Sequence, residues 1–146
     1  MSAENLLVWI MDIKVLDDNP IYKNETYRLE FRFSQSYPIG EDLDVQSYII
    51  SCSLLFLEAP EVVFLQDSTH KIPMHPHIYS NGIICLDLLD KAAWSPVHNV
   101  ESVCISLQSM LTGNTKQERP QGDEDFVRRN TRRPRDINFY FHDNTV

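Results

Sequence analysis

Apolar and polar residues alternate in a way that predicts three strands before residue 66. The clearest runs over residues 27–33, where apolar side chains alternate with charged ones and one face is therefore expected to be buried. Its apolar positions are Tyr27, Leu29, Phe31 and Phe33. A β-favouring run over residues 6–15 precedes it and stops at turn-forming residues 17–20, and a short strand is expected over residues 62–65. The short connection between the first two strands favours an antiparallel hairpin, and a meander is the economical assembly of all three.

A helical period replaces the alternation over residues 100–112. Apolar residues recur there at the spacing of one helix face, at Val100, Val103, Cys104, Leu107, Met110 and Leu111. Asn99 occupies the N-cap position and Gly113 follows the last helical residue. An amphipathic helix beside a sheet with one apolar face predicts an α+β domain. Cys104 is expected in its core.

Length and composition narrow the class of protein. A chain of 146 residues is expected to form one domain over residues 1–146. The net charge of -8 argues against a nucleic-acid partner, and no apolar run reaches the ~20 residues of a membrane-spanning helix. Three cysteines without a short paired spacing favour a reducing compartment, so we expect cytoplasm or nucleus.

Two regions lack a clear period. Residues 39–57 begin acidic and end strongly apolar, which is compatible with an added strand or helix, or with an exposed, aggregation-prone patch. Residues 117–146 are polar and turn-rich, and we expect a flexible basic and aromatic tail. Its five arginines are predicted to lie in a solvated loop, namely Arg128, Arg129, Arg132, Arg133 and Arg135. The acidic residues Asp123, Glu124 and Asp125 occupy a loop that could face an active site.

The most informative chemistry lies around Cys85. Asn81 and Gly82 form a tight-turn signal shortly before it, and the sequence Trp94-Ser95-Pro96 follows. A cysteine nucleophile needs a thiolate and access to water, whereas the alternative is a small buried hydrophobe. Local sequence leaves both open. His75, His77 and Cys85 lack a fourth ligand at normal spacing, so no metal site is expected.

The order of these motifs resembles that of the ubiquitin-conjugating enzymes. His75-Pro76-His77, Asn81-Gly82, Ile84-Cys85-Leu86 and Trp94-Ser95-Pro96 match the family's signature, and Ser36-Tyr37-Pro38 resembles its Tyr-Pro corner. His77, where most members have Asn, resembles the W-type branch, which conjugates ubiquitin to protein N-termini. The tail Phe139-Tyr140-Phe141-His142-Asp143 is similar in character to that of the branch, with Phe141 in place of a Tyr.

The resemblance implies a reaction and residues that carry it. Cys85 would hold ubiquitin as a thioester and pass it to an amine. His77 would stabilise the oxyanion or order the loop, and Asp87 would orient the incoming amine or face solvent. Structural positions near the site would be His75, Pro76, Asn81, Gly82 and Trp94.

Partners follow from the same resemblance. They are ubiquitin, the ubiquitin-activating enzyme, RING or U-box ligases, and substrate N-termini. Ligase contacts would involve Tyr37, Pro38, Ser95, Pro96 and Val97. No cofactor is expected, because the activating enzyme is the component that uses ATP.

Two departures from the family pattern leave a second function open. The family begins with a long amphipathic helix, whereas this chain starts almost at the first strand, and residues 39–57 interrupt the connection to the third strand as an insertion. The loss of the helix is expected to expose apolar area on the sheet. The chain is thus either an active conjugating enzyme or a catalytically inactive isoform that serves as a ubiquitin- or ligase-binding scaffold.

Overall fold

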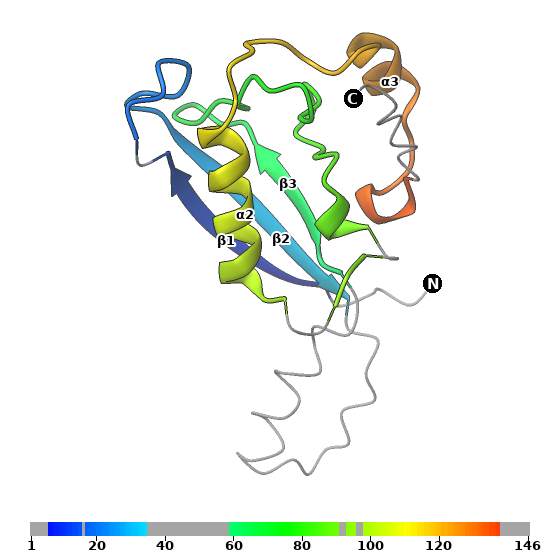
Figure 1. The fold of residues 1–146 in the computed structure, drawn as a ribbon. Coiled ribbons are helices and arrows are strands. Elements are labelled where there is room, and N and C mark those ends of the chain that lie inside the picture. Colours follow the sequence, from blue (N-terminus) through cyan, green and yellow to red (C-terminus); the bar gives the residue numbers. More distant parts are fainter. Residues whose placement is uncertain (1–5, 16, 35–58, 91–92, 96–97, 138–146) are drawn as a thin grey trace, which may run out of the picture.

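The computed structural model describes residues 6–15, 17–34, 59–90, 93–95 and 98–137 (Figure 1). A three-stranded antiparallel sheet in the order β1-β2-β3 forms its centre, and helix α2 lies across one face. The elements in chain order are β1 (Leu6–Lys14), β2 (Thr26–Ser34), β3 (Glu61–Leu65), the short 3-10 helix η1 (Asp87–Leu89), α2 (Val100–Thr112), α3 (Asp123–Arg129) and the 3-10 helix η2 (Pro134–Asp136).

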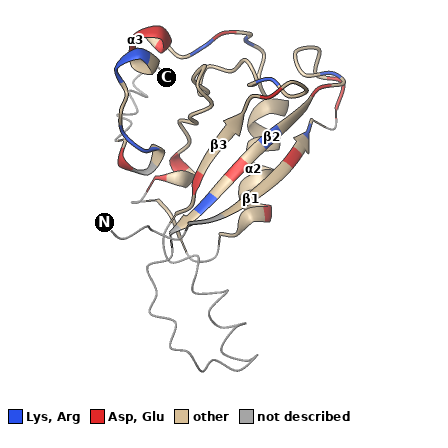
Figure 2. Ribbon diagram, turned by 180° about the vertical axis from the view of Figure 1, so that it is seen from behind, with Lys and Arg blue, Asp and Glu red and all other residues tan. Residues whose placement is uncertain are grey.

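The alternation in β2 sorts its side chains between the two faces of the sheet. Leu29 is paired with Met11 of β1 and Phe64 of β3, and it lies fully buried under α2. On the opposite face Arg28 donates to both Asp12 oxygens, at 2.8 and 3.0 Å. Arg28 also reaches Asp67 at 3.0 Å, so a charged ladder crosses this face of the sheet (Figure 2). The period of two thus places the core on one side and charge on the other.

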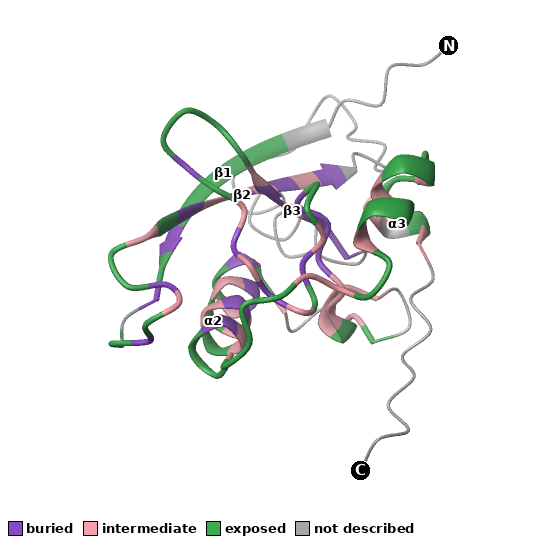
Figure 3. Cartoon of the chain, turned by 90° about the horizontal axis from the view of Figure 1, so that it is seen from above, coloured by how far each residue is buried: buried purple, intermediate pink, exposed green. Residues whose placement is uncertain are grey.

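Helix α2 supplies the other half of the core through one stripe of side chains. Val103, Leu107 and Leu111 are fully buried, whereas the outer side of the helix is exposed (Figure 3). At its start Asn99 accepts from the Ser102 N–H at 2.8 Å, and the Ser102 hydroxyl accepts from the Asn99 N–H at 2.9 Å. This capping box satisfies backbone groups that the first helical turn leaves open.

The predicted α+β class, the antiparallel meander and the amphipathic helix are confirmed, with element bounds within one residue of expectation. Gly113 does follow α2, but its φ of -76° is right-handed and its N–H donates to Ser109 O at 3.0 Å. Cys104 is half-buried and packs against the core, as expected.

The prediction that residues 117–146 lack regular structure is wrong for residues 123–129, which form α3. Three acidic residues in the first turn and Arg128 and Arg129 in the last turn complement the helix dipole, a charge pattern that does favour a helix. Arg132 and Arg133 are exposed beyond it, and η2 lies beside β3. The insertion at residues 39–57 and the aromatic tail from residue 139 lie outside the described residues.

Apolar side chains of β1 remain exposed on both faces of the sheet. Trp9 and Met11 share the helix-facing side with buried Ile13, yet they are 49% and 38% exposed.

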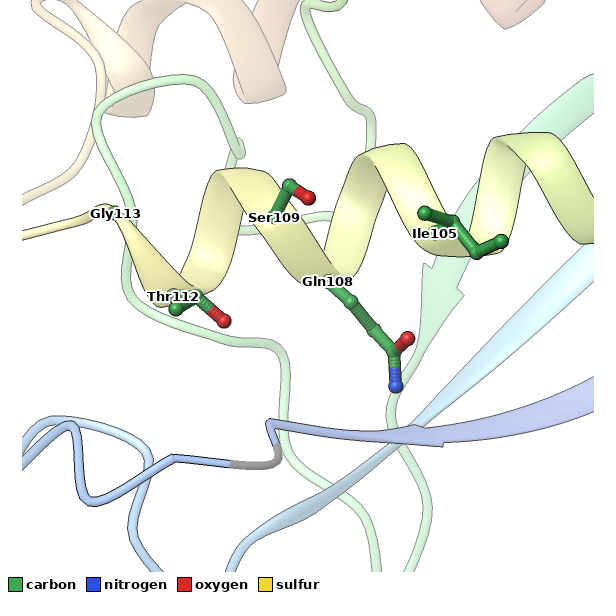
Figure 4. A pocket seen from close by; sticks show the side chains of 5 residues that line it. All are labelled: Ile105, Gln108, Ser109, Thr112 and Gly113. Atoms are coloured by element: carbon green, nitrogen blue, oxygen red, sulfur yellow. The ribbon is translucent and has the colours of Figure 1, made fainter.

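Along the outer side of α2 runs a shallow groove of about 400 Å³, lined by Ile105, Gln108, Ser109, Thr112 and Gly113 (Figure 4). Among the described residues, no helix has the length and apolar character required to cross a bilayer.

Candidate active site

The segment that carries Cys85 is fastened to β3 by a turn that only glycine fits. The Phe64 N–H donates to Gly82 O at 2.9 Å, and Val63 bridges to Ile83. Gly82 has φ +89°, and a Cβ placed on it would lie 2.0 Å from Phe64 O. A side chain at position 82 would therefore both strain the backbone and collide with the strand. The neighbouring Asn81 is exposed, and its Oδ1 accepts from the Ile83 N–H at 3.2 Å.

Cys85 is half-buried, with its backbone fixed by the preceding histidine motif. Its N–H donates to His77 O at 2.8 Å. Burial raises the pKa of the thiol to about 11, and the negative charge of Asp87 adds to the rise. The resting group at neutral pH is accordingly a thiol rather than a thiolate. Local sequence had left open a fully buried cysteine, and the structure places this residue between that extreme and full exposure.

His75 links the site to the core helix. Its side chain is 4% exposed, and Nδ1 accepts from the His77 N–H at 2.9 Å. Burial lowers the pKa of His75 to about 4, with His77 contributing, while a hydrogen bond to the Met110 backbone acts in the opposite direction. The ring is therefore neutral at pH 7, and its contacts join the loop to α2.

The remaining predicted residues near Cys85 in the sequence differ in exposure. The His77 side chain is exposed, and Pro76 is partly buried. Asp87 is exposed as the first residue of η1, where its carboxylate acts on the Cys85 thiol through space. An exposed carboxylate next to the thiol is compatible with both alternatives, orientation of an amine and simple solvation.

Trp94 and Ser95 lie in the segment between η1 and α2. Trp94 packs against the core cluster, its backbone N–H donates to Asp90 O at 2.9 Å, and its ring lies 5.5 Å from that of His98. Ser95 O accepts from the His98 N–H at 2.9 Å. The other residues predicted to contact ligases lie outside the described residues, namely Tyr37, Pro38, Pro96 and Val97.

Sequence reasoning missed Arg119 altogether. Its guanidinium donates to three backbone carbonyls of the segment that leads to Cys85, those of Ile72 at 3.2 Å, Pro73 at 2.7 Å and Ile78 at 3.1 Å. Desolvation lowers the pKa of this guanidinium. No motif or period marks an arginine that bonds to distant carbonyls, so no local signal could have found it.

Of the acidic residues expected near the site, Asp123 reaches it. Its Oδ1 accepts from the Ser80 N–H at 2.7 Å, and Asp123 is the first residue of α3 rather than part of a loop. Within the described residues, no three histidine, cysteine or acidic side chains gather into a set that could hold a metal ion. The groove beside α2 is lined by none of the predicted site residues.

Comparisons with known proteins agree with this arrangement. Residues 57–136 match the family described as "Ubiquitin-conjugating enzyme". A "Probable ubiquitin-conjugating enzyme E2 W" of Dictyostelium discoideum is 38% identical over 99% of this chain and 82% of its own length. A "Probable ubiquitin-conjugating enzyme E2 16" of Arabidopsis thaliana is 37% identical over 99% of this chain and 76% of its own.

A solved structure extends the agreement to three dimensions. The crystal structure of the ubiquitin-conjugating enzyme UbcA1 from Agrocybe aegerita has a TM-score of 0.69 and 35% identity, and the match covers 92% of this chain and 82% of that one. Members of this family are transferases with a thioester intermediate, and their general partners are ubiquitin, an activating enzyme and ligases. The capped α2, the antiparallel sheet and a half-buried cysteine after the Gly82 turn all fit, and the chain belongs to the ubiquitin-conjugating enzyme family.

Proposed function

We propose that this chain accepts ubiquitin on Cys85 as a thioester and transfers it to the α-amino group of a protein N-terminus. The observation that carries the proposal is the setting of Cys85, which is half-buried on a loop held by Gly82 and the His75 ring. In the transfer step the amine nitrogen bonds to the thioester carbonyl carbon and the C–S bond breaks. Cys85 leaves as a thiolate, and the proton lost by the amine passes to water. ATP is used upstream by the activating enzyme, so the chain itself needs no cofactor.

The raised pKa of Cys85 bears on both halves of this reaction. With a pKa of about 11, about one thiol in 10⁴ is ionised at pH 7, so the free enzyme reacts slowly with small electrophiles. A thiol of high pKa is also a poor leaving group. The thioester, once formed, therefore resists premature loss to weak nucleophiles.

The preference for an α-amine is supported by relatives and by amine chemistry. Proteins named as W-type enzymes in Dictyostelium discoideum, Danio rerio and Caenorhabditis elegans are 32–38% identical to this chain. At pH 7 roughly 10–20% of α-amines are neutral, against a few lysines in ten thousand. A site without strong base catalysis favours the amine that is already deprotonated.

Two further side chains are assigned roles in the transfer. The tetrahedral intermediate carries an oxyanion, and the exposed ring of His77 is assigned to donate a hydrogen bond to it. Asp87 is assigned to attract and orient the incoming amine, since its carboxylate lies close enough to Cys85 to raise the pKa of the thiol.

Charging the protein tests the proposal directly. Incubation with ubiquitin, activating enzyme and ATP should give an adduct that a thiol reductant removes. The adduct should be absent in Cys85→Ala and present in Cys104→Ala, which replaces the half-buried cysteine of α2. An adduct that forms equally on Cys85→Ala contradicts the assignment of the nucleophile.

The choice of amine needs its own measurement. The charged enzyme should discharge faster to a peptide with a free α-amine than to free lysine at pH 7. Faster discharge to lysine overturns the preference but leaves the conjugating activity standing.

A second candidate is a catalytically inactive scaffold that binds ubiquitin or a ligase. The observation that favours it is the low thiolate fraction that follows from the raised pKa of Cys85. This candidate requires that the wild-type chain form no reducible adduct and still bind ubiquitin or a RING ligase in a pull-down with the purified partner.

A further inference from the structure

Helix α3 contacts the loop before Cys85 at two points. The Asp123 carboxylate accepts from the Ser80 N–H at 2.7 Å, and the Phe126 ring stacks on Tyr79 with centroids 3.9 Å apart and planes 27° apart. No residue of α3 is buried, so the helix has no core stripe of its own. A helix of this length is not stable alone in water, and its contacts with the loop therefore help to hold it in place. By the same contacts, α3 holds residues 79 and 80.

The contacted residues belong to the turn that places Cys85. The Tyr79 N–H donates to Ile83 O and the Gly82 N–H donates to Tyr79 O, both at 2.9 Å. Burial is the main cause of a raised pKa of the Tyr79 phenol, and negative charge on Cys85 and Asp123 raises it further. The Tyr79 side chain therefore lies within electrostatic reach of both groups. A shift of residues 79 and 80 is accordingly transmitted through a short hydrogen-bonded turn to the thiol.

We propose that Asp123 and Phe126 are positioning residues for the reaction at Cys85. The carboxylate fixes the Ser80 backbone and the ring fixes Tyr79, and together they hold the thiol in the geometry for acyl transfer. The inference rests on the proposed function, since it concerns how fast Cys85 reacts. Misplacement of a reacting atom by about 1 Å can cost up to about 100-fold in rate, so contacts at this distance from the thiol suffice for a measurable effect.

Three substitutions separate the hydrogen bond from the charge. Asp123→Ala removes the acceptor, Asp123→Asn keeps an oxygen acceptor without the charge, and Glu124→Gln removes one charge from the same turn at an exposed site. Full-length variants are first loaded with ubiquitin as the thioester on Cys85. The single-turnover rate of ubiquitin transfer to a peptide α-amine is then measured at increasing peptide concentration. We expect Asp123→Ala to lower the rate at saturating amine about five- to ten-fold without changing the half-saturating amine concentration. Asp123→Asn and Glu124→Gln should stay within about two-fold of wild type.

The stacking contact is tested in the same assay. Phe126→Leu should slow discharge in the same way, whereas Phe126→Tyr should retain the wild-type rate because a phenol ring can still stack on Tyr79. Thermal unfolding of every variant should stay close to wild type, since no residue of α3 belongs to the buried core.

The outcomes distinguish this inference from the proposed function. A wild-type chain that cannot be charged overturns the proposed function and the positioning roles with it. If wild type forms the ubiquitin thioester but Asp123→Ala and Glu124→Gln transfer ubiquitin at equal rates, the positioning inference alone is overturned. Failure of Asp123→Asn to restore the rate overturns the hydrogen bond as the cause, and a rate loss that tracks lost folded protein overturns positioning.

Discussion

Single residues set the geometry of the Cys85 loop, and Gly82 is the position with least freedom. Its φ of +89° falls in the region that favours glycine, and Phe64 O occupies the space of a Cβ. The chain also offers two matched comparisons. Gly122 has φ +76° with nothing within 4 Å of the place that a Cβ would occupy, and Gly113 has neither a positive φ nor a contact closer than 3.5 Å there.

Substitution by alanine at these three glycines is therefore expected to destabilise the fold to three different extents. Gly82→Ala should lower the free energy of unfolding by about 3 kcal/mol or more, because strain and collision combine. Gly122→Ala should cost about 1 kcal/mol from strain alone, and Gly113→Ala should be close to neutral. Urea unfolding of the three variants measures the series, and an equal effect of Gly82→Ala and Gly122→Ala contradicts the collision with Phe64.

His75 makes the stability of the fold depend on pH. Its folded-state pKa of about 4 lies below the ordinary value of 6.5, so the unfolded chain takes up the proton first as pH falls. The contribution is complete above pH 6.5 and is lost as pH falls towards 4. Between pH 7 and pH 5 the loss should be about 2 kcal/mol.

The variant His75→Asn should flatten this pH dependence. An asparagine oxygen can still accept from the His77 N–H, but it does not titrate. The measurement is urea unfolding at pH 7 and pH 5 for both proteins. The same loss of stability in both would assign the pH dependence to other groups.

Among the elements, α2 contacts both the core and the loop that carries Cys85, and it begins at a well-defined cap. The helix contributes Leu107 and Leu111 to the core, and its Met110 backbone bonds the His75 ring of the loop. At the other end, the Asn19 amide donates to the carbonyls of Leu111, Thr112 and Asn114 at 3.3, 3.0 and 2.9 Å. A substitution that loosens either end of α2 is therefore expected to weaken the packing of both the core and the loop that carries Cys85.

The N-terminal cap gives the prediction at this scale. Asn99→Ala should lower the free energy of unfolding by about 1 kcal/mol, because the Ser102 N–H loses its acceptor. Asn99→Asp should retain wild-type stability, since a carboxylate accepts the same bond and complements the helix dipole. Guanidinium unfolding followed by helix circular dichroism checks both, and loss in Asn99→Asp equal to that in Asn99→Ala contradicts the capping role.

For the whole molecule, one core spans the sheet, the loop and α2. Phe31 and Phe64 from the sheet, Ile78 from the loop and Val103 from the helix belong to a single buried cluster. The exposed Trp9 and Met11 lie outside that cluster. Because the cluster joins all these elements, they are expected to unfold together.

A single cooperative transition is therefore expected on denaturation. Helix circular dichroism and tryptophan fluorescence should give coincident curves, since α2 and Trp94 pack against the same cluster and the Trp9 ring lies 5.4 Å from Phe33 of that cluster. The absence of a cooperative transition would mean that the chain as written does not fold stably. Separate midpoints for the two probes would contradict a single core.

The sequence by itself determined the elements and the position of the turn before Cys85. Period-two alternation defined β2, the spacing of Val103 and Leu107 defined α2, and the turn at Gly82 lies where the pattern predicted. These features depend on neighbours within a few residues, so local sequence is sufficient to specify them. The expectation of a loop over residues 123–125 was wrong because α3 is a short helix without an apolar stripe, and the charges at its two ends are its only local signal.

Only the tertiary structure decided which distant groups meet around Cys85. Arg119 reaches Ile72 and Pro73 across 46 or more residues of sequence, and Asp123 reaches Ser80 across 43. Burial of His75 and Cys85, and with it the direction of each pKa shift, arises only when the chain folds. Such contacts leave no periodic signal, because they join backbone groups and charges whose spacing along the chain is arbitrary and is fixed only when the core forms.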